Sequence, residues 1–185
     1  VNSNETIEPR TNPEHNFKYI ELADIDQNIG VIENVKTIKG KNAPSRARML
    51  LLNGDVIASS VEGSLDKVAL VSEEYDGAIG STGFFVLRPR TVSSGYLLAL
   101  IKSIIVREQM HCEASGTILS AVPAKSLKNI IVPNIPPEKQ DEISAFVQQS
   151  HAARREAKTL LEKAKRAVEI AIEYGEQQAM DFLCK

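Results

Sequence analysis

The chain has 185 residues, with 22 basic and 24 acidic side chains that give a formal net charge of −2 at pH 7. A chain of this length can hold one globular domain with a real core and one further element. The balanced charge argues against a general polyanion binder, which usually has an excess of basic residues. Because the sequence has no long apolar run and does not begin with a signal-peptide pattern, we expect a cytoplasmic protein without a membrane segment.

Short apolar runs separated by turn residues dominate the first part of the chain, which is the pattern of β-strands. Residues 19–25 and 30–38 predict two strands joined by a turn, and thus a hairpin. The sequence Asn-Gly-Asp at 53–55 predicts a second turn, because Asn and Gly tolerate a positive φ. The same pattern predicts further strands at residues 49–52, 56–58, 68–71, 78–79 and 84–87.

Helical spacing replaces this pattern from Tyr96 to about Met110, where we expect one helix packed against the sheet. Pro123 suits the first turn of a short helix, and residues 129–132 predict a last strand. Together these elements predict an α+β fold with a mixed or antiparallel sheet. We place this first domain at residues 1–136.

Residues 138–174 contain neither glycine nor proline, although all eight prolines and nine of the ten glycines lie in the residues before them. This absence predicts a helix of roughly 55 Å that starts sharply after Pro136 and Pro137. Gly175 is the expected stop or kink. We place this second, helical domain at residues 137–185.

Apolar and small residues in this helix follow one another at alternating steps of four and three, which is the seam of a coiled coil. We expect the helix to pair with a second copy of itself or with another chain. The alternative is that it lies on its own domain. The predicted pairing positions are Ile143, Val147, Ala157, Leu161, Ala164, Val168 and Ala171.

Residues that could carry catalysis are scattered along the sequence. His111 and Cys112 are the only adjacent pair that could act as base and nucleophile, and neighbours on a helix point in different directions. The chain has no glycine-rich phosphate loop with its lysine and no metal-ligand spacing. We therefore expect no enzyme, no catalytic residue, no metal and no cofactor, with Cys112 and Cys184 as reduced thiols.

Two kinds of feature suit a nucleic acid. Residues 35–54 carry five basic side chains and no acidic one, which predicts either a positive patch or an ordinary solvated loop. Polar loops at 59–64, 80–83 and 115–117 adjoin apolar segments. Hydroxyls and glycine amides suit phosphate oxygens, whereas charged and amide side chains can read base edges. Each loop, taken singly, is also compatible with a plain turn.

Four motifs follow one another along the first domain. They are Tyr-Ile-Glu-Leu-Ala-Asp-Ile at 19–25, Ser-Arg-Ala-Arg at 45–48, Gly-Asp-Val-Ile-Ala-Ser at 54–59 and Gly-Ser-Thr-Gly-Phe-Phe-Val-Leu-Arg-Pro at 80–89. The tail adds Gly-Thr at 116–117, Leu-Lys-Asn-Ile-Ile-Val-Pro at 127–133 and Gln-Asp-Glu-Ile at 140–143. This order, over residues 17–174, resembles the target recognition domain and conserved spacer helix of type I restriction-modification specificity subunits.

The resemblance implies a non-catalytic subunit that reads double-stranded DNA and positions an adenine methyltransferase subunit and a restriction (translocase and nuclease) subunit on a bipartite site. S-adenosylmethionine, ATP and Mg²⁺ are then expected only in those partners. Family members carry two recognition domains and two spacer helices, and this chain has one of each. We expect half of a longer subunit, or a short form that dimerises through the helix and reads a palindromic, interrupted site.

Candidate DNA contacts follow from the basic stretch and the polar loops. Glu62 stands where the family often has arginine, and its carboxylate could accept a hydrogen bond from the amino group of cytosine or adenine. The basic side chains are expected to contact phosphates, with an arginine as a possible reader of guanine. The predicted DNA-binding residues are Lys39, Lys41, Ser45, Arg46, Arg48, Ser59, Ser60, Glu62, Ser64, Lys67, Ser81, Thr82, Gly83, Ser115 and Thr117.

Two other interpretations stay open at this point. The chain could be the C-terminal specificity module of a fused methyltransferase-nuclease, because the segment that often precedes the first family motif is curtailed here. It could instead be a coiled-coil adaptor whose small domain binds a protein or peptide, which would fit the weakly acidic charge.

Overall fold

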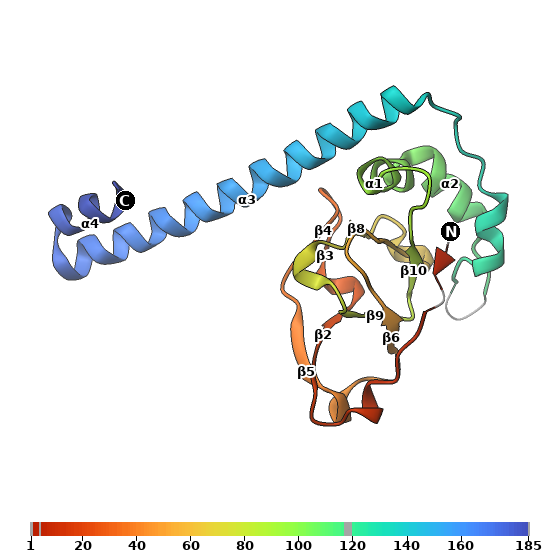
Figure 1. Ribbon diagram of the computed structural model, residues 1–185, viewed down its shortest axis with the longest axis horizontal. Helices are drawn as coiled ribbons and strands as arrows, with labels where there is room; N and C mark the ends of the chain where they lie inside the picture. Colours follow the sequence, from red (N-terminus) through yellow and green to blue (C-terminus); the bar gives the residue numbers. More distant parts are fainter. Residues whose placement is uncertain (1, 4, 117–119, 185) are drawn as a thin grey trace. The chain divides into compact units, whose positions relative to one another are not determined.

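The computed structural model describes residues 2–3, 5–116 and 120–184 (Figure 1). Contacts divide the chain into two compact units, Val1–Val147 and Gln148–Lys185. The first unit holds every strand, the helices α1 and α2, and the first turns of α3. No helix among the described residues is both long and apolar enough to cross a membrane.

Two four-stranded sheets form the body of the first unit. The first sheet is antiparallel and has the order β1 (Asn2–Ser3), β10 (Phe84–Leu87), β7 (Val56–Ser59), β8 (Val68–Leu70). The second has the order β5 (Lys36–Lys39), β2 (Asn16–Ile20), β9 (Ile79–Ser81), β6 (Ala47–Leu50). Only β2 and β9 run parallel within it. Ile20, Ile57 and Val86, from both sheets, share one buried core cluster. The mixed sheets and the long helix confirm the predicted α+β fold.

The predicted hairpin of residues 19–25 and 30–38 forms, but each of its strands is broken in two. Phe17 of β2 lies opposite Ile38 of β5, whereas the short strands β3 (Ile25–Asp26) and β4 (Val31–Ile32) make a separate ladder. The breaks have local causes. Asp24 accepts a hydrogen bond from the backbone N–H of Glu21 at 2.8 Å and closes a 3₁₀ turn, and Asn34 has a φ of 58°.

The single helix expected from Tyr96 to Met110 is in fact two, α1 (Ser94–Lys102) and α2 (Ile104–Glu113). Ser103 separates them with an extended ψ of 145°, and its hydroxyl accepts the Val106 N–H at 3.4 Å as the N-cap of α2. Leu98 and Met110 of these helices are buried against Phe85 of the first sheet. The sequence predicted a single helix because the apolar residues keep their helical spacing across Ser103, and a capping residue does not change that spacing.

The segment after α2 holds a 3₁₀ helix, η6 (Ala124–Asn129), which begins after Pro123 as expected. The strand predicted at residues 129–132 does not form. The side chain of Gln109 instead satisfies both backbone groups of Ile131, accepting from its N–H at 2.7 Å and donating to its carbonyl at 2.9 Å. These groups are therefore occupied by a side chain and not by a neighbouring strand.

The long helix α3 (Pro137–Tyr174) confirms the glycine-free and proline-free segment. Its first turns pack on α1 within the first unit. A Cβ at Gly95 would lie 2.6 Å from the Ser144 hydroxyl oxygen and 3.1 Å from its Cα, so only glycine permits this approach. Val147 packs against the apolar cluster of α1 and α2. The predicted pairing position Val147 is thus partly used by the domain itself.

The second unit is a helical hairpin. Gly175, with a φ of 95°, ends α3, and α4 (Glu176–Leu183) turns back along it. Ala167 and Ala179 are buried, and Lys163 donates to the carbonyl of Leu183 at 2.9 Å. The stop predicted at Gly175 is confirmed. Large apolar side chains stay exposed on α3, namely Leu160, Leu161, Val168 and Ile172.

Candidate nucleic-acid interface

Backbone hydrogen bonds bring the three polar loops side by side. The Ser60 N–H donates to the carbonyl of Gly83 at 2.8 Å, which joins the loop after β7 to the turn between β9 and β10. The Glu62 N–H donates to the carbonyl of Ser120 at 3.0 Å, and Val122 donates to Ser60 at 2.8 Å. We call the described residues of these three segments, 59–67, 81–83, and 115–116 with 120–122, the polar loop cluster. The sequence predicted each loop separately, and the fold makes them one surface.

Arg46 adjoins this cluster, because the Thr82 N–H donates to the Arg46 carbonyl at 2.8 Å. Both side chains are exposed. Within the part of the chain that the structure describes, the Arg46 guanidinium has neither an ion pair nor a hydrogen bond. Ser45, beside it, is also exposed, and its carbonyl accepts from Arg48 at 3.0 Å. The Arg46 guanidinium is therefore available to bind another group at the edge of the polar loop cluster.

Three of the predicted serines shape the loops from inside. Ser59 has no exposed surface; its hydroxyl lies 2.9 Å from that of Ser64 and accepts the Val61 N–H at 3.0 Å. Ser81, 6% exposed, accepts the Gly83 N–H at 3.2 Å. The half-buried Ser64 can also donate to the carbonyl of Val61 at 3.2 Å. Direct DNA contact by Ser59 and Ser81 is contradicted by their burial, since their hydroxyls face the protein.

Glu62 is paired with a residue that the sequence did not single out as a DNA contact. Its carboxylate lies 3.6 Å from Nδ1 of His111 at the end of α2, and the two side chains are 40% and 48% exposed. In the sequence His111 stands out only as the neighbour of Cys112, and no sequence pattern links it to a loop so far upstream. The pair places a carboxylate and an imidazole together on the polar loop cluster.

The basic run at residues 35–54 is largely neutralised by acidic residues that precede it. Lys39 and Lys41 each lie 2.8 Å from a carboxylate oxygen of Glu14, and Arg48 pairs with Glu8. Lys36 lies 3.4 Å from Glu21. The hydrogen bonds from Lys39 and then Lys41 hold the pKa of Glu14 below its ordinary value. The expected positive patch is therefore a set of ion pairs, with Arg46 as its exception.

These ion pairs remain compatible with contacts to phosphate. The pairs of Glu14 with Lys39 and Lys41 are solvent-exposed, with both lysines about half exposed, and such pairs contribute only about 0–1 kcal/mol. A lysine can therefore exchange a surface carboxylate for a phosphate at little cost.

The other predicted residues lie in different surroundings. The ammonium of Lys67 donates to the carbonyl of Ile25 at 3.4 Å. Ser115 is exposed and forms an isolated antiparallel β-bridge with Ala121. Thr117 lies outside the described residues. Residues 2–3, 5–116 and 120–184 contain no group of three or more His, Cys, Asp or Glu side chains that could hold a metal ion. Cys112 and Cys184 are exposed free thiols.

Comparisons with known proteins place this geometry in a family. Neither a protein-family model nor a curated protein sequence matches the chain. The HsdS subunit from Thermoanaerobacter tengcongensis matches with a TM-score of 0.71 and 33% identity over 91% of this chain. A structure from a study of complex assembly and conformational transition of the type I R-M system matches with a TM-score of 0.71 and 34% identity over 90%.

In both cases the match covers 43% of the solved chain, so this chain spans less than half the length of these relatives. The sequence identity is high enough to show more than a shared fold, and the match extends over both the first unit and the long helix. The chain therefore belongs to the HsdS specificity subunits of type I restriction-modification systems.

Proposed function

We propose that this chain is a non-catalytic DNA-reading part of a type I specificity subunit, whose first unit reads one half of a bipartite double-stranded target. One observation carries the proposal. The fold gathers exposed polar groups from four separate segments, namely Arg46, Glu62, Thr82 and His111, around a single loop cluster. Loops on a rigid scaffold are where binding residues concentrate.

The groups on this surface divide between the two kinds of contact that DNA requires. Arg46 has no competing carboxylate, so it is the first candidate for a phosphate or a guanine. Lys39, Lys41 and Arg48 are further phosphate candidates once they leave Glu14 and Glu8. Glu62 repels phosphate but can accept a hydrogen bond from a base amino group, which makes it the candidate base reader.

The partners follow from the family. We propose that the chain binds an adenine methyltransferase subunit and a restriction subunit in the cytoplasm, and that S-adenosylmethionine, ATP and Mg²⁺ act in those subunits. We also propose that two copies pair through α3, which would supply the second recognition domain that a bipartite site requires. Leu161 and Val168, 56% and 60% exposed, support this pairing because isolated helices rarely leave such a row in water.

Adenine methylation in cells tests the DNA-reading proposal. Cells that express the chain with its cognate methyltransferase should gain methylation at a new interrupted palindrome, compared with cells that lack the chain. An asymmetric bipartite site would show that a second recognition domain comes from another chain. Unchanged methylation, with the methyltransferase present and bound, would contradict the proposal.

Light scattering tests the pairing separately. The wild-type chain should run as a dimer, and Leu161→Glu with Val168→Glu should run as a monomer because two charges enter the seam. Thr159→Glu adds a charge outside the predicted seam and should stay dimeric. A dimer that survives the double substitution would exclude this face of α3.

A further inference from the structure

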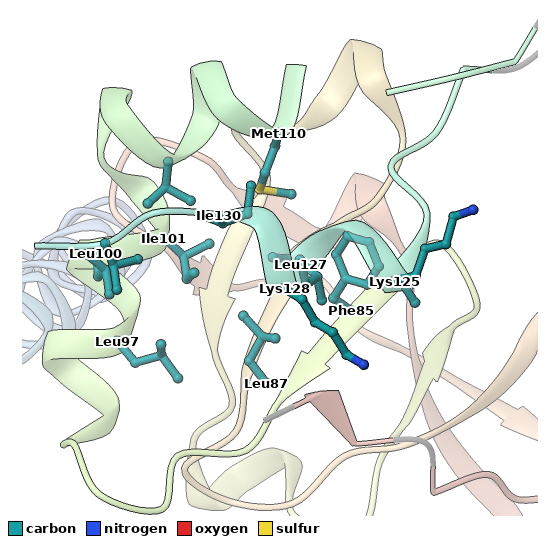
Figure 2. A pocket seen from close by; sticks show the side chains of 14 residues that line it. Phe85, Leu87, Leu97, Leu100, Ile101, Met110, Lys125, Leu127, Lys128 and Ile130 are labelled. Atoms are coloured by element: carbon teal, nitrogen blue, oxygen red, sulfur yellow. The ribbon is translucent and has the colours of Figure 1, made fainter. Parts of the chain in front are cut away.

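The first unit contains an apolar groove that shares no lining residue with the polar loop cluster or with the proposed DNA contacts. Figure 2 shows the side chains that line this groove. Its volume is about 700 Å³, within the range of about 300–1,000 Å³ typical of binding sites. Phe85 and Leu87 of β10 line it together with Leu97 and Ile101 of α1, and Leu127 of η6 lines it as well. The groove thus runs between a helix pair, a sheet and a 3₁₀ helix.

Polar contacts on the α2 side hold this groove open. The Gln109 side chain bonds both backbone groups of Ile131, and Asn129 donates to a carboxylate oxygen of Glu113 at 3.2 Å. Hydrogen bonds from Ser126 and then Asn129 lower the pKa of Glu113, as expected for a carboxylate held as an acceptor. Because η6 and the residues after it are tied to α2, the groove is preformed and an occupant need not order it.

Apolar surface continues beyond the groove. Val132 lines the groove and is 48% exposed, and its neighbour Ile131 is 77% exposed. Gln109 also donates to the carbonyl of Ile105, which is 61% exposed, so Ile105 and Ile131 lie on either side of one side chain. A small molecule in the groove would leave these residues in water. A protein segment that fills the groove and crosses its lip would cover them.

Charge at the groove identifies the kind of segment. Lys125 and Lys128 are three residues apart on η6, and residues at that spacing share one side of a 3₁₀ helix. Figure 2 shows both side chains reaching out from η6 beside the apolar residues. Neither ammonium has an ion pair within the described part of the chain. The groove therefore presents apolar walls with two uncompensated cations on one side.

We propose that this groove binds an amphipathic helix of a partner protein, with an apolar stripe in the groove and carboxylates along the flank that faces Lys125 and Lys128. This is the helix-in-groove mode of recognition, in which apolar anchors supply affinity and flanking charges fix the orientation. Duplex DNA is a poor occupant, because the apolar walls offer nothing to phosphates or base edges. The assignment does not depend on what the polar loop cluster binds.

Two designed helical peptides of about four turns test the proposal against the full chain by fluorescence anisotropy. Both carry the same leucine stripe, and one has glutamates and the other lysines along one flank. The glutamate peptide should bind about tenfold more tightly, equal to about 1.4 kcal/mol. Lys125→Glu with Lys128→Glu should reverse this preference. Lys18→Glu with Lys36→Glu, the same charge change on the paired strands β2 and β5 of the other sheet, should leave it unchanged.

A substitution at the lip separates groove binding from surface charge. Val132→Glu should weaken both peptides. Val132 is 48% exposed, so the variant should stay folded, and circular dichroism checks this. Equal affinity for the two peptides, no binding of either, or a preference that Lys125 and Lys128 do not control would overturn the proposal. Saturable binding of laurate without binding of either peptide would instead identify a small-lipid site and would also overturn it.

Discussion

Ser60 gives both of its donors to one acceptor: its N–H and its hydroxyl lie 2.8 and 3.0 Å from the carbonyl oxygen of Gly83. This contact joins two loops of the polar loop cluster. We expect Ser60→Ala to lower the free energy of unfolding by about 1 kcal/mol, because one partly buried hydrogen bond is lost. Ser72→Ala is the matched control, since the Ser72 hydroxyl makes no cap bond. Urea denaturation measures both, and equal values would show that the hydroxyl contributes nothing.

Arg46 and Arg48 are two residues apart but differ in what surrounds them. Arg48 already pairs with Glu8, whereas Arg46 is exposed beside Thr82. In the assembled complex, Arg46→Ala should therefore weaken DNA binding more than Arg48→Ala. If Arg46 contacts a phosphate, the slope of log affinity against log salt should fall by about 0.9. Titrations at several salt concentrations measure the slope. Equal losses for the two variants would contradict the assignment.

Glu62 should affect which sequence is read more than how tightly DNA is held. Replacement by Gln adds a donor and removes the charge, so we expect Glu62→Gln to change the preferred base at one position by about 1–3 kcal/mol. Sequencing of methylated adenines reports the preference. Glu73→Gln, which removes an exposed acid from another turn, serves as the control. An unchanged target for both Glu62→Gln and Glu62→Arg would exclude a role for Glu62 in reading.

The turn between β6 and β7 depends on a buried charge. Asp55 is 1% exposed, and Arg88 donates to its two oxygens at 2.8 and 3.0 Å. Arg88→Ala would leave this carboxylate without its cation, so we expect a loss of about 3–5 kcal/mol in the free energy of unfolding. Arg88 has a second, exposed partner in Glu5. Glu5→Gln should lower the free energy of unfolding by at most about 1 kcal/mol. Thermal and urea denaturation separate the two.

Glu14 provides a prediction on pH. Its pKa is lowered by Lys39 and then Lys41, so its stabilising contribution is present above the pKa of the unfolded chain and is lost as the pH falls through the folded value. Lys39→Gln with Lys41→Gln should raise the Glu14 pKa toward its ordinary range in an NMR titration. Lys36→Gln should not, because Lys36 pairs with Glu21. The same Glu14 pKa in the wild type and in the Lys39→Gln, Lys41→Gln variant would refute these ion pairs in solution.

Elements that depend on local chemistry could be predicted from the sequence. The absence of glycine and proline over residues 138–174 determined α3, and the positive φ of Gly175 ends it. The apolar runs located most strands to within a few residues. Local signals failed where a single polar side chain redirected the backbone, as Ser103 does between α1 and α2 and Gln109 does at Ile131.

The candidate site was only half visible in the sequence. Its three loops could be named because serine, threonine and glycine gather in each of them. Their adjacency could not, since it rests on hydrogen bonds such as Glu62 to Ser120 between segments distant in the chain. Burial was not visible in the sequence either. Ser59 and Ser81 were predicted as DNA contacts, but both are buried and their hydroxyls stabilise the loops.

The local sequence therefore determined which helices and strands form and which family motifs are present, because both depend on residues that are neighbours in the chain. The tertiary structure alone decided which charges are free. Residues 35–54 look uniformly basic, yet Glu8, Glu14 and Glu21 return through the fold to neutralise all of its cations except Arg46. Ion pairing depends on distance in space, and the order of residues along a chain does not specify that distance.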